Sequence, residues 1–345
     1  MNSCHKCQTK IPLMNTGEMI LSICDEEANL ALIKKMEQIG INIFSGLNKL
    51  HIPYANWEQL QRCTSLIQSV LNDEQLDKFK GYLKTNEQSD VFEMKKYPLS
   101  QLSLIIENPM FVKIIQEKLF QSFMQPIISA LDQEVIGYEF LLRPNSKIYS
   151  FSPGDLFLFS QHAGLQSTLD SQARVNAIRT GSQFLPKGVK QFINFLPSSI
   201  YDPVHCLKST FEAVEEYDVD PEDLVFEVVE TEKIRDLVHL KNIFEHYQRA
   251  GIKVALDDIG SGYSTIELLK ELKPDYAKID RDLIRNCHVD SSKLEKVQQL
   301  RMVTKEMGII LLAEGIETME EYNAVQPYVD LAQGYYFGKP MRNPA

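Results

Sequence analysis

The pattern of apolar and polar positions changes near residue 120. Beyond it, short apolar runs of strand length alternate with longer amphipathic segments, such as 237–250 and 294–307, that have the apolar spacing of helices. The predicted strands are 123–128, 135–142, 191–196, 224–229, 253–257, 276–279, 309–313 and 331–337. Repeated strand–helix alternation is typical of a parallel sheet, and eight strand candidates favour a closed, TIM-type (β/α)8 barrel over an open doubly wound sheet. The G-x-G-x-x-G and Walker patterns of nucleotide-binding open sheets are absent from the sequence.

Residues 1–85 follow another pattern, which predicts a small α+β module with a regulatory or sensory role. Strands are expected at 18–23 and 41–44, and two helices are expected to begin after the capping residues Asp25 and Asn56. The first helix would bury Ala28, Leu32, Met36 and Ile39, and a third helical stretch would carry Leu76, Phe79 and Leu83. The polar segment 85–90 is the expected boundary, followed by a mainly helical connector over 86–114 and a barrel over 115–345. Residues 102–123 are expected to be mainly helical.

The charge of the chain bears on its partners. The sequence has 345 residues with 47 Asp and Glu against 36 Lys and Arg, a net charge of −11. Binding to nucleic acid depends on Lys and Arg that neutralise phosphates, so DNA is not an expected partner. No apolar run reaches the ~20 residues that cross a bilayer, and the polar start lacks the apolar stretch of a secretory signal. We therefore expect a cytoplasmic protein without membrane insertion.

Six cysteines are sparse for this length, and in a cytoplasmic protein they are expected to be thiols. Cys4 and Cys7 have the C-x-x-C spacing of half a zinc site, to which Cys24 or His51 could add ligands. A complete four-ligand set at a standard spacing is absent, so two thiols near the terminus are the favoured interpretation and structural zinc is the alternative.

Polar residues lie in or directly after seven successive predicted barrel strands. They are Glu139, Asn194, Glu227 with Glu230, Asp257 with Asp258, Lys278 with Asp280, Glu314 with Glu317, and Gln333. A single one of them could be a helix cap or a solvated loop residue, but capping does not explain the whole set. In a (β/α)8 barrel the carboxyl ends of the strands meet at one face, where active sites lie. The set therefore predicts a polar site at that face.

Several carboxylates in one barrel mouth need a positive partner, because two like charges ~4 Å apart repel by ~4 kcal/mol at an effective dielectric constant of about 20. The candidate ligands are oxygen atoms, which favours Mg²⁺ or Mn²⁺ over zinc. Neighbouring carboxylates such as Asp257 and Asp258 could serve two ions, an arrangement suited to attack on a phosphodiester. Lys278 could orient a water or stabilise developing charge, or it could form a buried salt bridge with Asp280.

These residues carry a resemblance to a known family. The motifs are Gln125-Pro126-Ile127, Glu139-Phe140-Leu141-Leu142-Arg143, Asn194, Glu227-Val228-Val229-Glu230, the run from Asp257 to Ser264, Lys278-Ile279-Asp280, Ala313-Glu314-Gly315-Ile316-Glu317-Thr318 and Gln333-Gly334-Tyr335-Tyr336-Phe337. In this order and at these spacings, residues 115–345 resemble the EAL-domain cyclic di-GMP phosphodiesterases. The resemblance implies a modified TIM barrel that hydrolyses cyclic di-GMP to linear pGpG.

The resemblance also implies roles for single residues, which are expectations here. The first metal would be held by Glu139, Asn194, Glu227 and Asp257, and the second by Asp257 and Asp258, with Glu314 and Gln333 close by. The expected catalytic residues are Lys278, which would position the attacking water, together with Glu314 and Glu139; whether Glu314 acts as a base or mainly as a ligand depends on the number of bound ions. The expected substrate-binding residues are Gln125, Leu141, Arg143, Asp280 and Gln333.

In the family, a loop that matches Asp257–Thr265 couples dimerisation to activity and is anchored by glutamates that match Glu230 and Glu317. The resemblance therefore implies a homodimer through the barrel. Three residues depart from the family pattern, namely Phe140, Leu196 and Ile259. An alternating strand would direct Phe140 away from Glu139, so a change in packing only is expected. None of the departures removes a ligand.

Two other functions compete with the phosphodiesterase. A catalytically silent receptor would bind cyclic di-GMP and signal through a protein partner, and it would be indicated by lost metal ligands or a degraded 257–264 loop, neither of which is seen. A Mg²⁺-dependent lyase of the enolase type would need a Lys or His base that serves an α-proton, and it does not explain the ordered motifs.

Overall fold

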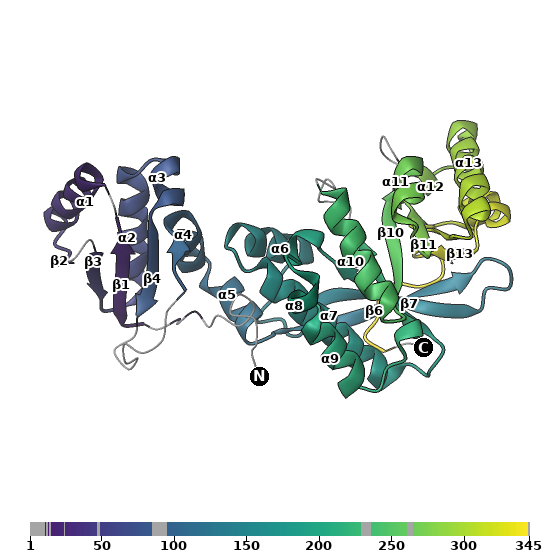
Figure 1. Ribbon diagram of the computed structural model, residues 1–345, viewed down its shortest axis with the longest axis horizontal. Coiled ribbons are helices and arrows are strands. Elements are labelled where there is room, and N and C mark those ends of the chain that lie inside the picture. Colours follow the sequence, from purple (N-terminus) through teal and green to yellow (C-terminus); the bar gives the residue numbers. More distant parts are fainter. Residues whose placement is uncertain are drawn as a thin grey trace. The chain divides into compact units, whose positions relative to one another are not determined.

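The computed structural model describes residues 11, 13, 15–23, 25–46, 49–84, 95–228, 236–260 and 265–343. The chain forms two compact units, residues 1–120 with 144–169 and residues 121–143 with 170–345 (Figure 1). The predicted division into 1–85, 86–114 and 115–345 stays a prediction, and its boundary at 85–90 lies outside the described residues. In the described part of the chain, no helix combines the length and the apolar character needed to cross a membrane.

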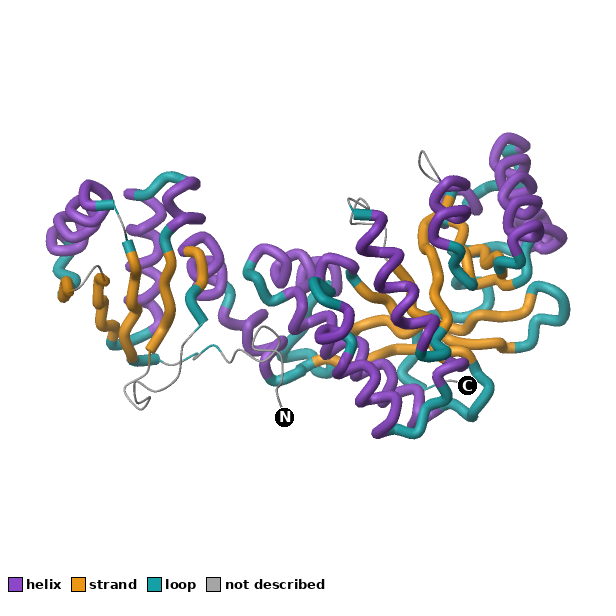
Figure 2. The backbone as a smooth tube through the Cα atoms, viewed as in Figure 1, coloured by secondary structure: helices purple, strands orange, loops and turns teal. Residues whose placement is uncertain are grey.

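The first unit contains a five-stranded sheet with the order β2-β3-β1-β4-β5 (Figure 2). Its strands are β1 (Gly17–Ser22), β2 (Phe44–Gly46), β3 (Lys49–Tyr54), β4 (Lys80–Lys84) and β5 (Tyr97–Pro98). Its helices are α1 (Glu26–Gln38), α2 (Trp57–Val70), α3 (Asp73–Lys78), α4 (Leu99–Glu107), α5 (Pro109–Gln116) and α6 (Pro153–His162). All the strand pairs are antiparallel. The predicted α+β character of the amino-terminal module is confirmed.

The helix caps predicted for this unit are confirmed. The Asp25 carboxylate accepts a hydrogen bond from the Ala28 N–H at 3.1 Å, and the Asn56 side chain accepts one from the Gln59 N–H at 2.8 Å. Each cap satisfies a backbone donor that has no partner within its helix. The local signals at these helix starts therefore agree with the fold.

Other local predictions for this unit were wrong. The strand expected at 41–44 lies at Phe44–Gly46, and strand β3 was missed. Leu83 belongs to β4 instead of a third helix, because β4 pairs with β1 over a long sequence separation and this pairing overrides the local apolar spacing. Ile39 was expected on the buried face of α1 but is 52% exposed, since the helix ends at Gln38.

The second unit is built around a closed barrel with the strand order β10-β11-β12-β13-β6-β7-β8-β9. Its strands are β6 (Phe120–Ser129), β7 (Val135–Pro144), β8 (Lys190–Phe195), β9 (Leu224–Val228), β10 (Lys253–Ile259), β11 (Tyr276–Ile279), β12 (Ile310–Ala313) and β13 (Leu331–Gln333). Neighbours from β7 to β13 along the chain pair in parallel, whereas β6 pairs antiparallel with β13. The eight-stranded, modified TIM barrel is confirmed.

Helices join and cover these strands. They are α7 (Gln166–Phe184), α8 (Pro203–Cys206), α9 (Lys208–Glu216), α10 (Leu237–Arg249), α11 (Thr265–Leu272), α12 (Arg281–Ile284), α13 (Ser291–Met307) and α14 (Met319–Val325), with short 3₁₀ turns at Pro197–Ser199, Pro221–Asp223 and Gln326–Tyr328. Two predicted bounds need correction. The helical stretch 102–123 ends before β6 begins at Phe120, and the strand expected over 331–337 stops at Gln333.

One buried cluster fills the barrel interior with a single residue from each of seven strands. Its members, which we call the apolar layer, are Ile127, Phe192, Val225, Ala255, Tyr276, Leu312 and Leu331. The rings of Phe192 and Tyr276 meet edge to face, with centroids 5.2 Å apart. A larger cluster joins the outward-facing strand residues to the helices. The apolar layer closes the barrel below the polar side chains described next.

The loop after β13 and the loop after β12 approach each other so closely that Gly334 cannot carry a side chain. A Cβ atom on Gly334 would lie 2.0 Å from the carbonyl oxygen of Ile316. The Ile316 N–H donates to the Gln333 carbonyl at 3.1 Å, and the Tyr336 N–H donates to the Ile316 carbonyl at 3.1 Å. These hydrogen bonds tie the carboxyl ends of two barrel strands together.

We expect Gly334→Ala to lower the free energy of unfolding by about 2 kcal/mol, because the added methyl must push two hydrogen-bonded backbones apart. Urea denaturation followed by circular dichroism measures the change. Gly154→Ala is the matched control, since a Cβ there would meet only the Ser152 hydroxyl at 3.8 Å. Equal stabilities of the two variants would contradict this account of the contact.

Candidate active site

A ring of polar side chains lies two residues along the strands from the apolar layer, toward the mouth of the barrel. Side chains alternate between the two faces of a strand, so a residue two positions beyond a layer residue points to the same side. The positions two beyond layer residues on β8 to β13 are Asn194, Glu227, Asp257, Lys278, Glu314 and Gln333. Because β6 runs in the opposite direction to β13, its polar residue, Gln125, precedes the layer residue Ile127 by two positions. With Glu139 of β7, which pairs in register with Phe192, these residues form what we call the polar ring.

Lys278 stands at the centre of the polar ring and is 1% exposed. Its Nζ lies 2.7 Å from Glu227 Oε2, and it also contacts the Glu314 carboxylate. The same Nζ lies 3.6 Å from Asp257 and 3.9 Å from Glu139. Burial by itself lowers the pKa of Lys278, but the four carboxylates offset this and raise the pKa well above its ordinary value. The surrounding carboxylates therefore favour the charged form of Lys278.

The surrounding carboxylates are more numerous than this one charge can neutralise. Burial raises the pKa of Glu227 well above its ordinary value, and the opposing effect of Lys278 does not cancel the shift. Burial and the charge of Asp257 raise the pKa of Glu314 in the same way, and burial raises the pKa of Asp257. The polar ring thus holds an excess of acidic groups that further positive charge would stabilise.

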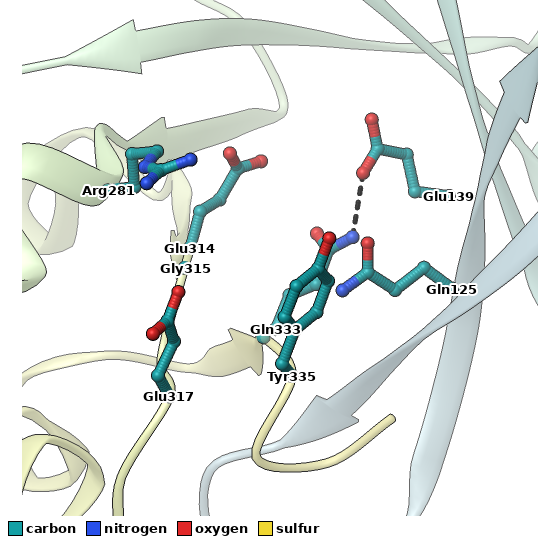
Figure 3. A pocket seen from close by; sticks show the side chains of 9 residues that line it. Gln125, Glu139, Arg281, Glu314, Gly315, Glu317, Gln333 and Tyr335 are labelled. Atoms are coloured by element: carbon teal, nitrogen blue, oxygen red, sulfur yellow. Dashed lines mark hydrogen bonds between the residues drawn. The ribbon is translucent and has the colours of Figure 1, made fainter. Parts of the chain in front are cut away.

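Glu139 is oriented by two amide side chains of the polar ring. Its Oε1 accepts a hydrogen bond from Asn194 Nδ2 at 3.0 Å. Its Oε2 accepts one from Gln333 Nε2 at 2.7 Å, which Figure 3 shows as a dashed line. The amide oxygen of Gln333 and Glu227 Oε1 are buried and have no hydrogen-bond partner among the described residues. A buried acceptor without a donor is costly in free energy. A cation bound to these two oxygen atoms would remove that cost.

The backbone at Asp257 and Asp258 departs from a regular strand. Consecutive side chains of a strand point to opposite faces, which would separate the two carboxylates. Here the register between β10 and β11 shifts between Leu256 and Ile259, and Asp258 has a left-handed φ of 54°. The Asp258 N–H also donates to the Asp257 carboxylate at 2.8 Å. The irregularity brings carboxylate oxygens of Asp257, Asp258 and Glu314 within 4.8 Å of one another.

These residues fit a hard divalent cation. All the available ligands are carboxylate or amide oxygens, and buried oxygen atoms without donors are present beside them. Asp257, Asp258 and Glu314 could hold one ion. Glu139, Asn194, Glu227 and Asp257 supply oxygens for the first metal expected from the sequence.

A cavity of about 190 Å³ opens beside the polar ring. Its lining residues are Gln125, Glu139, Arg281, Glu314, Gly315, Glu317, Gln333, Gly334 and Tyr335 (Figure 3). Arg281 and Tyr335 were not assigned from the sequence as site residues. The signal that could have found Arg281 is its position two residues after the end of β11, the strand that carries Lys278.

The structure brings most of the residues expected at the site into one place, namely Gln125, Glu139, Asn194, Glu227, Asp257, Asp258, Lys278, Glu314, Glu317 and Gln333. Leu141 and Arg143 lie on β7 outside the cavity lining, and the Arg143 guanidinium donates to the Leu142 carbonyl at 2.7 Å. Asp280 caps α12 by accepting a hydrogen bond from the Asp282 N–H at 2.7 Å. The substrate-binding roles of these three residues stay predictions.

Other residues singled out in the sequence lie away from the polar ring, and some of them lie outside the described part of the chain. Phe140 is buried in the outer cluster, which confirms its expected packing role. Glu230, Cys4, Cys7 and Cys24 lie outside the described residues. His51 Nδ1 lies 3.1 Å from a carboxylate oxygen of Glu18 on the neighbouring strand. The cysteines confirmed as free thiols are Cys63, Cys206 and Cys287.

Comparison with known proteins gives matches to the barrel, and in one solved structure to nearly the whole chain. A family model described as EAL domain matches residues 110–340. The probable cyclic di-GMP phosphodiesterase PdeG of Escherichia coli (strain K12) is 31% identical over 233 residues, which are 64% of this chain and 44% of PdeG. The chain thus spans less than half the length of this relative.

Two solved structures extend the comparison. The standalone versatile EAL protein from Vibrio cholerae O395, in its c-di-GMP bound form, is 33% identical with a TM-score of 0.59, covering 66% of this chain and 94% of that one. BlrP1 of Klebsiella pneumoniae, in a manganese/cy-diGMP complex at pH 9.0, is 23% identical with a TM-score of 0.59, covering 95% and 97% of the two chains. At this lower identity the match with BlrP1 shows the fold alone.

We expect Mn²⁺ or Ca²⁺ to raise the thermal stability of the chain through the polar ring. An ion at about 100 times its Kd adds about 2.7 kcal/mol to the free energy of unfolding, and EDTA should reverse the gain. Differential scanning calorimetry with and without ion measures it. Asp258→Asn should reduce the gain, because Asn removes the charge while tolerating the left-handed backbone at this position.

Glu320→Gln, at an exposed position of α14, is the control that should keep the full gain. A gain that is unchanged in Asp258→Asn would place the ion elsewhere.

Proposed function

Because the chain belongs to the EAL domain family, we propose that it is a metal-dependent phosphodiesterase that hydrolyses cyclic di-GMP to linear pGpG. The proposal is supported by a relative named as a probable cyclic di-GMP phosphodiesterase and by an EAL structure with bound c-di-GMP. Mg²⁺ and Mn²⁺ are the proposed ions, in keeping with the oxygen ligands of the site and with the manganese complex of BlrP1.

The observation that carries this proposal is the intact polar ring. A receptor that only binds the dinucleotide would not need four carboxylates around a buried lysine. The carboxylates repel one another, and this repulsion lowers the stability of the fold. Every metal ligand expected from the sequence is present in the described residues, and Asp257, Asp258 and Glu314 converge. This arrangement is suited to chemistry on a phosphodiester more than to binding alone.

In the proposed reaction a water oxygen attacks one phosphorus atom and the bond from that phosphorus to the ribose 3′ oxygen breaks. The products of this step are a 5′-phosphate and a 3′-hydroxyl group. The bound ions would supply Lewis-acid stabilisation of the attacked phosphate and lower the pKa of the water. Lys278 would orient the attacking water, since its ammonium is fixed by four carboxylates and cannot swing away.

Glu314 is assigned to metal binding, because its carboxylate lies with those of Asp257 and Asp258. Glu139 would be held in place by Asn194 and Gln333, which limits its freedom as a ligand. Arg143 would grip the attacked phosphate. The resemblance is the basis for this last role.

Other features also stay proposals. A homodimer through the barrel, anchoring of the 257–265 loop by Glu230 and Glu317, a cytoplasmic location and a regulatory role for the amino-terminal unit follow from the sequence and the resemblance. Structural zinc at Cys4 and Cys7 remains the alternative to free thiols.

The test is hydrolysis of cyclic di-GMP by the purified chain with Mg²⁺, Mn²⁺, Ca²⁺ or EDTA, with the products resolved by chromatography. We expect pGpG with Mg²⁺ or Mn²⁺ and no turnover in EDTA. Glu139→Ala should abolish turnover at saturating Mg²⁺, because it removes an oxygen ligand of the first ion. Tight binding without turnover in any ion would instead indicate the receptor.

We expect Lys278→Met to lower kcat by about 100-fold or more while the Kd for cyclic di-GMP in Ca²⁺ changes much less, because positioning of a water matters mainly in the transition state. Steady-state kinetics and calorimetric titration measure the two quantities. Lys270→Met, at an exposed position of α11, is the matched control. Equal losses of rate and affinity would make Lys278 a substrate contact.

A further inference from the structure

Arg281 occupies the side of the cavity that the sequence did not assign. It is the first residue of α12, directly after β11 and the capping residue Asp280. Figure 3 shows its guanidinium directed toward the carboxylate end of Glu314, on the other side of the cavity from Gln125 and Glu139. The side chain is exposed, so it borders the open part of the cavity.

Gly315 makes this placement of Arg281 feasible. Gly315 has a φ of 69°, a left-handed conformation that favours glycine. A Cβ atom on it would lie 2.5 Å from the Cβ of Arg281 and 3.2 Å from its Cα. The loop after β12 therefore lies directly against the start of the Arg281 side chain. The contact fixes the stem of Arg281 beside the cavity.

The charge of Arg281 has no acidic partner among the residues that the structure describes. Among the described residues that line the cavity, Arg281 is the cation, whereas Glu139, Glu314 and Glu317 are acidic. Lys278 is already surrounded by four carboxylates. In contrast, the Arg281 guanidinium has no ion-pair partner in the part of the chain that the structure describes. An exposed, unpaired guanidinium beside a cavity is suited to binding a phosphate, whose oxygens match its planar fork.

The strand order places Arg281 across the barrel from Arg143. Arg143 lies near the end of β7, and Arg281 follows β11. In the closed barrel these two strands are four strands apart in either direction, which puts the two arginines on opposite sides of the same mouth. A cyclic dinucleotide also carries two phosphodiester groups on opposite sides of one ring. The strand order thus places one arginine on each side of the mouth, as a ligand with two phosphates would require.

We propose that Arg281 binds the second phosphodiester of the cyclic dinucleotide, the one that is not cleaved. This assignment rests on the proposed function and extends it: one phosphate lies at the polar ring, and the other is held at the cavity edge by Arg281. Arg281 is then a substrate-binding residue that favours cyclic dinucleotides over phosphodiesters with a single phosphate.

The test compares Arg281→Met with the wild-type chain. Met keeps the stem beside Gly315 and removes the charge. We expect the Kd for cyclic di-GMP in Ca²⁺ and the KM in Mg²⁺ to rise about tenfold or more, with kcat nearly unchanged. Hydrolysis of bis(4-nitrophenyl) phosphate, which has one phosphodiester, should be unchanged. Arg281→Lys should recover part of the affinity, because it restores the charge without the fork.

Arg285→Met is the matched control, since Arg285 is exposed at the other end of α12 and does not line the cavity. It should behave as wild type. Unchanged affinity in Arg281→Met would overturn the assignment, as would equal losses on both substrates, which would place Arg281 at the cleaved phosphate or in the fold. If the wild-type chain binds no cyclic di-GMP, the proposed function falls as well, whereas a fully active Arg281→Met overturns the Arg281 assignment alone.

Discussion

The ammonium of Lys278, buried among four carboxylates, is the interaction on which the site depends. A lysine that is 1% exposed would be very costly without partners, and four buried or half-buried acids would repel one another without it. The ammonium and the carboxylates therefore stabilise one another inside the barrel. The balance is incomplete, because one positive charge faces several negative ones. This deficit is the physical reason to expect divalent cations at the polar ring.

The barrel supplies this arrangement by simple repetition. On seven of the eight strands one buried apolar residue fills the interior, and on β8 to β13 the residue two positions further along points to the same side at the mouth. The antiparallel β6 obeys the same rule in reverse. The alternation of side chains is broken where two neighbours must act together: the irregular backbone at Asp258, which costs about 1 kcal/mol, brings the carboxylates of Asp257 and Asp258 to one place.

Much of this site could be predicted from the sequence, because its residues lie at the carboxyl ends of apolar strands whose order along the chain is also their order around most of the barrel. Glu139, Asn194, Glu227, Asp257, Lys278, Glu314 and Gln333 were all expected there and meet there. Arg281 was missed because it lies two residues beyond the end of its strand, and its place beside the cavity depends on the close approach of Gly315 from another loop. In the amino-terminal unit, β4 was missed for a similar reason, since its pairing with β1 is a long-range contact that local spacing does not encode.

The most direct test of the account is the location of the cation. Crystals of the chain grown with Mn²⁺ and cyclic di-GMP, measured at an X-ray energy where manganese scatters anomalously, would place the ion without reference to activity. The account predicts an anomalous peak in contact with carboxylate oxygens of Asp257, Asp258 and Glu314, beside an intact Lys278 cluster. The absence of manganese from the polar ring in such crystals, with the dinucleotide bound in the barrel mouth, would contradict it.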